Sequence, residues 1–195
     1  MTTPHLHCPA FAPAFAPAFA LALARHPDDP ATLAFAGVIA QSLRARRQPL
    51  IRGLNEDGFR NLLDTFFPGL DCPNGAARDD QLKLFEYDEF DDIVALLLSH
   101  RAYGEEMESW LAHAIATASM GENHLWQDMG LPNRTVLSAL MQKHFPSLAA
   151  LNDQDMKWKK FFYRQLCELA GVLICKSPRC AECCDYRICF GPEDA

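Results

Sequence analysis

Five of the chain's eight cysteines lie close together, between Cys175 and Cys189. Four of them follow the spacing Cys175-x4-Cys180-x2-Cys183-x5-Cys189. Connections this short allow all four sulfur atoms to reach one point in space, and this limits how the segment can fold. Thiolates prefer soft metals, so zinc or an iron–sulfur cluster is the usual occupant of such a point. The spacing therefore predicts a C-terminal metal-binding loop, which the rest of the chain presents as a scaffold.

The spacing alone leaves the kind of metal centre open. Zinc sites commonly use two Cys-x2-Cys pairs with a longer spacer, whereas this segment has one such pair and a single cysteine on each side. The compact arrangement favours an iron–sulfur cluster, with structural zinc, disulfides and free thiols as alternatives. The opening Cys-x4-Cys-x2-Cys also matches plant-type ferredoxins, but those need a β-rich body that this sequence does not predict. The neighbouring Cys184 makes Cys180, Cys184 and Cys189 an alternative set of ligands.

The N-terminal segment, residues 1–24, is of low complexity, with Phe-Ala-Pro-Ala repeated from Phe11. Regular prolines interrupt a continuous helix, so we expect a flexible leader. No Lys or Arg precedes its apolar stretch, which argues against a signal peptide. Without export the chain stays in the cytoplasm, where reducing conditions favour metal ligation over disulfides. No segment is long and apolar enough to span a bilayer.

Apolar residues at helical spacing predict that residues 25–195 form a single all-α domain. Asp29, which precedes Pro30, and Asn133 are expected to cap helices, and no segment shows the alternation of a strand. The predicted helices cover about 30–47, 55–67, 88–99, 105–120, 133–144 and 155–170, and the metal-binding tail covers 171–195.

The charge of the chain is uneven. Its formal net charge of −7 makes nucleic acid a poor partner, because phosphate binding needs a basic surface. From Lys157 onwards, however, seven basic residues outnumber five acidic ones. Lys157, Lys160 and Arg164 lie on one face of the last predicted helix, which suits an anion near the cysteines. Cys167, on the same helix, is expected to be a buried apolar side chain.

Two segments of the C-terminal half are distinctive together. Residues 155–167 read Asp-Met-Lys-Trp-Lys-Lys-Phe-Phe-Tyr-Arg-Gln-Leu-Cys and precede the cysteine spacing and Phe190-Gly191-Pro192, while residues 121–131 read Gly-Glu-Asn-His-Leu-Trp-Gln-Asp-Met-Gly-Leu. This combination resembles the NifQ family of nitrogenase maturation. The resemblance is strong from about 120 to 193, weaker from about 30 to 119 and absent in the leader.

The resemblance implies a protein that handles molybdenum in the biosynthesis of the nitrogenase iron–molybdenum cofactor. It implies an iron–sulfur cluster of the 4Fe–4S or 3Fe–4S type that incorporates molybdenum, with Cys175, Cys180, Cys183 and Cys189 as the ligands by position. Molybdate would be the metal source, and the cofactor-assembly scaffold and the nitrogenase reductase protein would receive the metal. Such a protein is a carrier and not an enzyme, and neither nucleic acid nor a membrane is expected among its partners.

Basic and histidine side chains suit the same role. Molybdenum arrives as an oxyanion, which Lys157, Lys160 and Arg164 are suited to attract. His124, in a predicted loop, is a candidate additional ligand or transfer residue; the alternative is that it only caps or hydrogen-bonds within the fold. Two other functions fit the cysteines: an iron–sulfur electron-transfer protein, and a helical interaction module whose tail is held by zinc.

Overall fold

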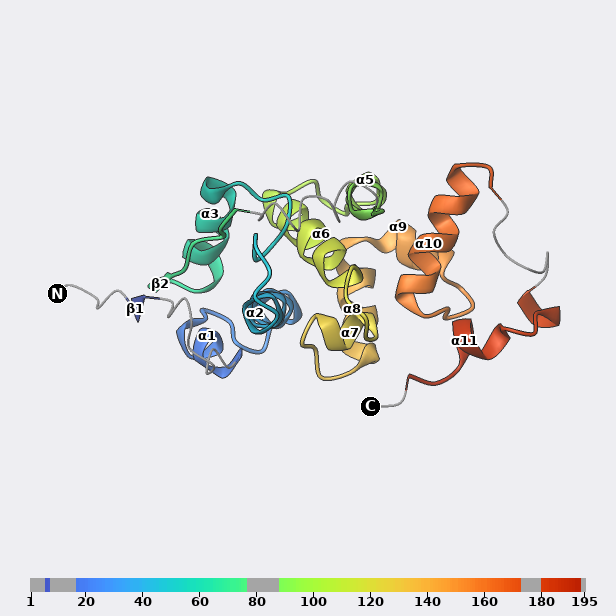
Figure 1. The fold of residues 1–195 in the computed structure, drawn as a ribbon, viewed down its shortest axis with the longest axis horizontal. Coiled ribbons are helices and arrows are strands. Elements are labelled where there is room, and N and C mark those ends of the chain that lie inside the picture. The colour runs from blue at the N-terminus through green and yellow to red at the C-terminus, as the bar shows by residue number, and fades with distance from the viewer. Residues whose placement is uncertain (1–5, 8–16, 77–87, 173–179, 194–195) are drawn as a thin grey trace.

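The computed structural model describes residues 6–7, 17–76, 88–172 and 180–193. Nearly all regular structure in these ranges is helical, which confirms the predicted all-α class (Figure 1). Two short strands, β1 (Leu6–His7) and β2 (Leu70–Asp71), pair in parallel. The helices are α1 (Pro17–Leu23), α2 (Pro30–Arg44), α3 (Glu56–Phe66), α5 (Phe90–Ser99), α6 (Glu106–Ser119), α7 (Leu125–Asp128), α8 (Arg134–His144), α9 (Pro146–Leu151), α10 (Trp158–Leu169) and α11 (Tyr186–Phe190), and a 3-10 turn covers Cys180–Glu182.

Side-chain caps explain where several helices begin. The carboxylate of Asp29 accepts hydrogen bonds from the amides of Ala31 (3.0 Å) and Thr32 (3.2 Å) at the start of α2. Asn55 and Asn133 cap α3 and α8 in the same way. Such caps satisfy amides that have no partner within the helix. The six predicted helices agree with α2, α3, α5, α6, α8 and α10 to within three residues at each border.

The leader differs from its prediction. Helix α1 lies inside the segment that was expected to be flexible and without a continuous helix. Pro17 stands at the first helical position, where its missing amide costs nothing, and no proline follows it before Pro27. Ala20 is fully buried, so α1 is part of the packed structure. Residues 8–16, which include most of the Phe-Ala-Pro-Ala repeat that starts at Phe11, lie outside the described residues.

Helix α6 forms the centre of the core and contacts α2, α3, α5 and α7. Its small side chains Ala112, Ala114 and Ala116 are completely buried, which lets neighbouring helices approach closely. A second close approach joins α2 to the turn after α7, where a Cβ added at Gly37 would overlap the carbonyl of Met129. The 121–131 segment is therefore fixed to the body of the protein.

Helix α10 lies towards the end of the molecule opposite α1, and it contacts α5 (Figure 1). Beyond it, the chain passes through the 3-10 turn and α11 and then runs back towards α7 and α8. This arrangement places the cysteine segment beside α10. In the described part of the chain, no helix has the length and apolar content needed to cross a membrane.

Candidate metal centre and two adjoining cavities

One face of α10 anchors the site. Trp158, Phe161 and Phe162 are buried, and their rings pack together with centroids about 6 Å apart. The indole nitrogen of Trp158 also donates a hydrogen bond to Ser138 Oγ at 3.2 Å. These apolar contacts fix the rotation of the helix, so its polar side chains face the C-terminal segment and the 121–128 loop.

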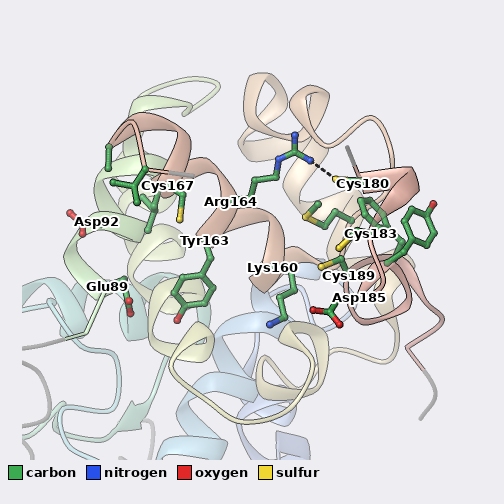
Figure 2. A pocket seen from close by; sticks show the side chains of 16 residues that line it. Glu89, Asp92, Lys160, Tyr163, Arg164, Cys167, Cys180, Cys183, Asp185 and Cys189 are labelled. Carbon is green, nitrogen blue, oxygen red and sulfur yellow. Dashed lines mark hydrogen bonds between the residues drawn. The ribbon is translucent and has the colours of Figure 1, made fainter. Parts of the chain in front are cut away.

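A cavity of about 560 Å³, here called the thiol cavity, opens between α10 and the C-terminal segment. The cysteines Cys180, Cys183 and Cys189 line it from one side, and Figure 2 shows their sulfur atoms gathered there. Lys160 and Arg164 of α10 also line this cavity. Three of the four predicted metal ligands therefore share one cavity with two of the predicted basic residues.

Arg164 makes the direct connection between α10 and the cysteines. Its Nη1 atom donates a hydrogen bond to Cys180 Sγ at 3.2 Å (Figure 2). A guanidinium is always charged, so this contact places a fixed positive charge beside the sulfur. Such a charge offsets the negative charge that thiolate ligands bring to a metal centre.

The 3-10 turn Cys180–Glu182 leads directly into two adjacent cysteines, Cys183 and Cys184, whose side chains have different surroundings. Within the turn, the amide of Cys183 donates to the carbonyl of Cys180 at 3.0 Å, and Cys183 lines the thiol cavity. Cys184 is exposed, does not line that cavity, and directs its thiol towards Asp185 Oδ1 at 3.8 Å. Of the two neighbours, Cys183 is therefore the better placed to act with Cys180 and Cys189.

The donor set of the thiol cavity fits a thiophilic metal or an iron–sulfur cluster, since three sulfur atoms line one side of a roomy space. The predicted fourth ligand, Cys175, lies outside the described residues. Within the residues that the structure does describe, no three His, Cys, Asp or Glu side chains are arranged closely enough to hold a metal ion.

A second cavity, of about 730 Å³, lies between α10 and the 121–128 loop. Lys157, Lys159 and Lys160 line it together with His124, and we call it the lysine cavity. Lys160 and Tyr163 line both cavities. Burial and, more weakly, two nearby acidic side chains raise the pKa of Tyr163, so its hydroxyl stays protonated where the cavities adjoin.

Lys159 clamps the 121–128 loop to α10. Its ammonium donates to Asp128 Oδ2 at 2.6 Å and to the carbonyl of Gly121 at 2.8 Å. The same carboxylate accepts hydrogen bonds from the backbone and side-chain nitrogens of Asn123. Burial lowers the pKa of Lys159, and the hydrogen bond and charge of Asp128 oppose that change. Sequence reasoning missed Lys159, because its partner lies 31 residues away.

His124 lies in the loop directly before α7, as predicted, at the position that caps this helix. Its amide donates to Gln127 Oε1 at 3.1 Å, and its ring Nδ1 lies 3.8 Å from Glu193 Oε1. The Glu193 side chain is only 5% exposed and also pairs with Arg134 at 3.3 Å. His124 thus stands at a helix start and lines the lysine cavity, so both of its expected roles remain compatible with its position.

The predicted basic face is divided between the cavities. Lys157 lines the lysine cavity, Arg164 lines the thiol cavity, and Lys160 lines both. Lys157 does not share a helical face with Lys160 and Arg164 as predicted, because it precedes the first turn of α10 and has an extended backbone, with a ψ of 129°. Cys167 differs from its prediction too, since it is only partly buried and lines the thiol cavity on the side away from the other cysteines (Figure 2).

Fold and site together define a class: a helical protein that gathers C-terminal thiols in a cavity beside a second, lysine-lined one. The sequence model of the NifQ family matches residues 34–191, and the chain belongs to that family. It is similar to Protein NifQ of Azotobacter vinelandii (38% identical; 74% of this chain and 80% of the relative) and of Rhodobacter capsulatus (39%; 82% and 89%). A shorter match joins it to Protein NifQ of Klebsiella pneumoniae (51%; 41% and 48%).

No solved structure matches the chain. Membership of the NifQ family implies a part in nitrogen fixation, in the biosynthesis of the nitrogenase iron–molybdenum cofactor.

Proposed function

We propose that this protein is a cytoplasmic molybdenum carrier that donates the metal to iron–molybdenum cofactor assembly. Molybdenum is its cargo, held in or at an iron–sulfur cluster whose ligands are Cys175, Cys180, Cys183 and Cys189. The observation that supports this most directly is the position of three of these cysteines on one side of a single cavity. The donor set suits the purpose, because soft sulfur ligands bind reduced molybdenum and iron alike.

The side chains around the cysteines would tune the site. Arg164 donates to the sulfur of Cys180, and Lys160 lines the same cavity, so both offset negative charge on thiolates and on an anionic cluster. A bound cluster would supply sulfide ligands for molybdenum in addition to the protein's own thiolates.

A carrier must also release its cargo. Cys180 lies in a 3-10 turn, Cys183 directly follows that turn, and Cys189 lies on the five-residue helix α11, so none of the three is inside the main core. Elements with little buried apolar surface open at a lower cost in free energy than core helices do. Release from this position therefore requires no unfolding of the body of the protein.

The proposed recipients are the cofactor-assembly scaffold and the nitrogenase reductase protein. Val172, Tyr186 and Ile188 expose large apolar side chains and line the two cavities. Exposed apolar surface of this kind commonly forms protein contacts. A partner bound here would approach the cysteines directly, as metal transfer requires, and no turnover chemistry by the protein itself is needed.

The deciding experiment measures iron, sulfide and molybdenum in protein purified without oxygen from cells supplied with molybdate. We expect all three elements in the wild-type protein, a large loss in Cys183→Ala, and nearly wild-type contents in the matched variant Cys184→Ala. Iron without molybdenum, together with a reversible one-electron couple, would instead indicate electron transfer. Zinc alone would indicate a structural tail, and unchanged contents in Cys183→Ala would refute the ligand assignment.

A further inference from the structure

We propose that the lysine cavity is a separate binding site for a tetrahedral oxyanion of the molybdate type, which receives the anion before the thiols do. This inference rests on the proposed carrier function. The sequence predicted only that Lys157, Lys160 and Arg164 together attract an anion. The present proposal assigns anion binding to the lysine cavity alone, whereas Arg164 lines the thiol cavity.

The charges in this cavity favour an anion. Lys159 is already paired with Asp128, so its charge is compensated. Within the described part of the chain, the ammonium groups of Lys157 and Lys160 form no ion pair, and both line the cavity. Two uncompensated cations in one concave space attract an anion more strongly than isolated surface lysines do. At the rim, the exposed Glu122 opposes them.

Neutral donors complete the lining. His124 and Gln127 line the cavity, and the side-chain amide nitrogen of Gln127 can donate a hydrogen bond to an oxyanion oxygen, whereas the Ser119 hydroxyl already donates to the carbonyl of Ile115 at 2.8 Å. Helix α10 begins beside the lysines without any side-chain cap, so its first amides add a weak positive field. These features suit several oxygen atoms on one compact anion, as in a tetrahedral oxyanion.

A carboxylate of the protein already occupies one edge of this cavity. Glu193 lines it, is almost fully buried, and is held by Arg134 at 3.3 Å, with His124 Nδ1 at 3.8 Å. This edge of the cavity therefore accommodates a negative charge in the absence of any bound ligand. An incoming oxyanion would experience repulsion from Glu193, so this residue should weaken anion binding.

The position of the cavity connects it to the cysteines. Lys160 and Tyr163 line both cavities, and the amide of Lys157 donates to the carbonyl of Cys189 at 2.8 Å. An anion held by Lys157 and Lys160 would therefore lie next to the wall that presents a predicted metal ligand. The binding step needs no bond to break and no change of oxidation state.

The test is equilibrium dialysis of the full-length, metal-free protein against molybdate, with bound molybdenum counted by mass spectrometry. We expect the double variant Lys157→Gln/Lys160→Gln to bind about tenfold more weakly, because two charged contacts are lost. Lys143→Gln is the matched control, since that lysine is 59% exposed and lines neither cavity. Glu193→Gln should bind more tightly than the wild-type protein.

Two further measurements separate this site from the cysteines. Cys183→Ala should keep the wild-type affinity for molybdate, and sulfate should compete, because the cavity recognises charge and shape and not sulfur affinity. Wild-type affinity in the double lysine variant, loss of binding in Cys183→Ala, or failure of sulfate to compete would each overturn the proposal. The carrier function has its own readout, the molybdenum content of the anaerobically purified protein, so the two ideas can fail separately.

Discussion

The ion pair between Lys159 and Asp128 should stabilise the fold far more than the other ion pair on α10. Lys159 and Asp128 are 16% and 12% exposed, with nitrogen and oxygen 2.6 Å apart. Arg164 and Glu168 have nearly the same separation, 2.7 Å, but are 37% and 48% exposed. The second pair has a similar separation but much greater contact with water, so it serves as an exposed control for the effect of burial.

The expected magnitudes follow from burial. At an effective dielectric constant of about 20, opposite charges as close as Lys159 and Asp128 attract by about 6 kcal/mol. Desolvation of both groups offsets most of this attraction, which leaves a net coupling of about 2 kcal/mol. The exposed pair, with i and i+4 spacing, should contribute about 0.3–0.5 kcal/mol. Asp128→Asn alone should cost about 3 kcal/mol, because it leaves a partly buried ammonium without a charged partner.

The assay is a double-mutant cycle by urea unfolding, followed by circular dichroism at neutral pH. It compares the wild-type protein with Asp128→Asn, Lys159→Met and the double variant, and Glu168→Gln provides the exposed control. A coupling free energy below about 0.5 kcal/mol, or a loss in Asp128→Asn no larger than in Glu168→Gln, would refute the reasoning. In that case its apolar contacts and remaining hydrogen bonds would be enough to hold the 121–128 loop to the body.

Three further predictions concern packing, pH and metal retention. Gly37→Ala should destabilise the protein by about 3 kcal/mol, since its Cβ would overlap the backbone of the turn after α7. The control Gly58→Ala should change the free energy of unfolding by less than about 1 kcal/mol. Urea unfolding midpoints of the two variants would test both values. Burial lowers the pKa of His144 in the folded protein, so as the pH falls through the unfolded value of about 6.5 the unfolded chain binds a proton there more readily than the folded protein, and stability should fall from pH 7.5 to 5.5. His144→Gln should lessen that fall, and an equal fall in both proteins would contradict the assignment. Arg164→Gln should lower the iron content of anaerobically purified protein, while Glu168→Gln should leave it unchanged; equal contents in the two variants would remove Arg164 from the proposed centre.

Local signals in the sequence predicted much of this fold. The caps at Asp29, Asn55 and Asn133 act on amides two or three residues away, so their effect can be read from the sequence. The buried face of α10 was visible from its spacing for the same reason. The helices α7, α9 and α11 span four to six residues, which is too short for a periodic pattern to reveal.

The candidate site was less accessible, because it depends on contacts between distant segments. The cysteine spacing identified Cys180, Cys183 and Cys189, but only the folded structure shows that Cys183 lines the thiol cavity and that Cys184 does not. The second cavity could not be predicted at all, since it exists only where the 121–128 loop meets α10. The pairing of Lys159 with Asp128 joins these two segments, and helical periodicity carries no information about that pairing.

The cysteine segment is attached at both of its borders. On one side it continues from α10, and on the other Glu193 is bound by Arg134 while the carbonyl of Cys189 accepts the amide of Lys157. The entropy cost of bringing the two ends of this segment together is therefore part of folding, and it does not recur when a metal binds. In the proposed carrier cycle, the thiols would keep a high effective concentration towards one another after the metal has left, so the emptied protein could be reloaded without a new search for its ligands.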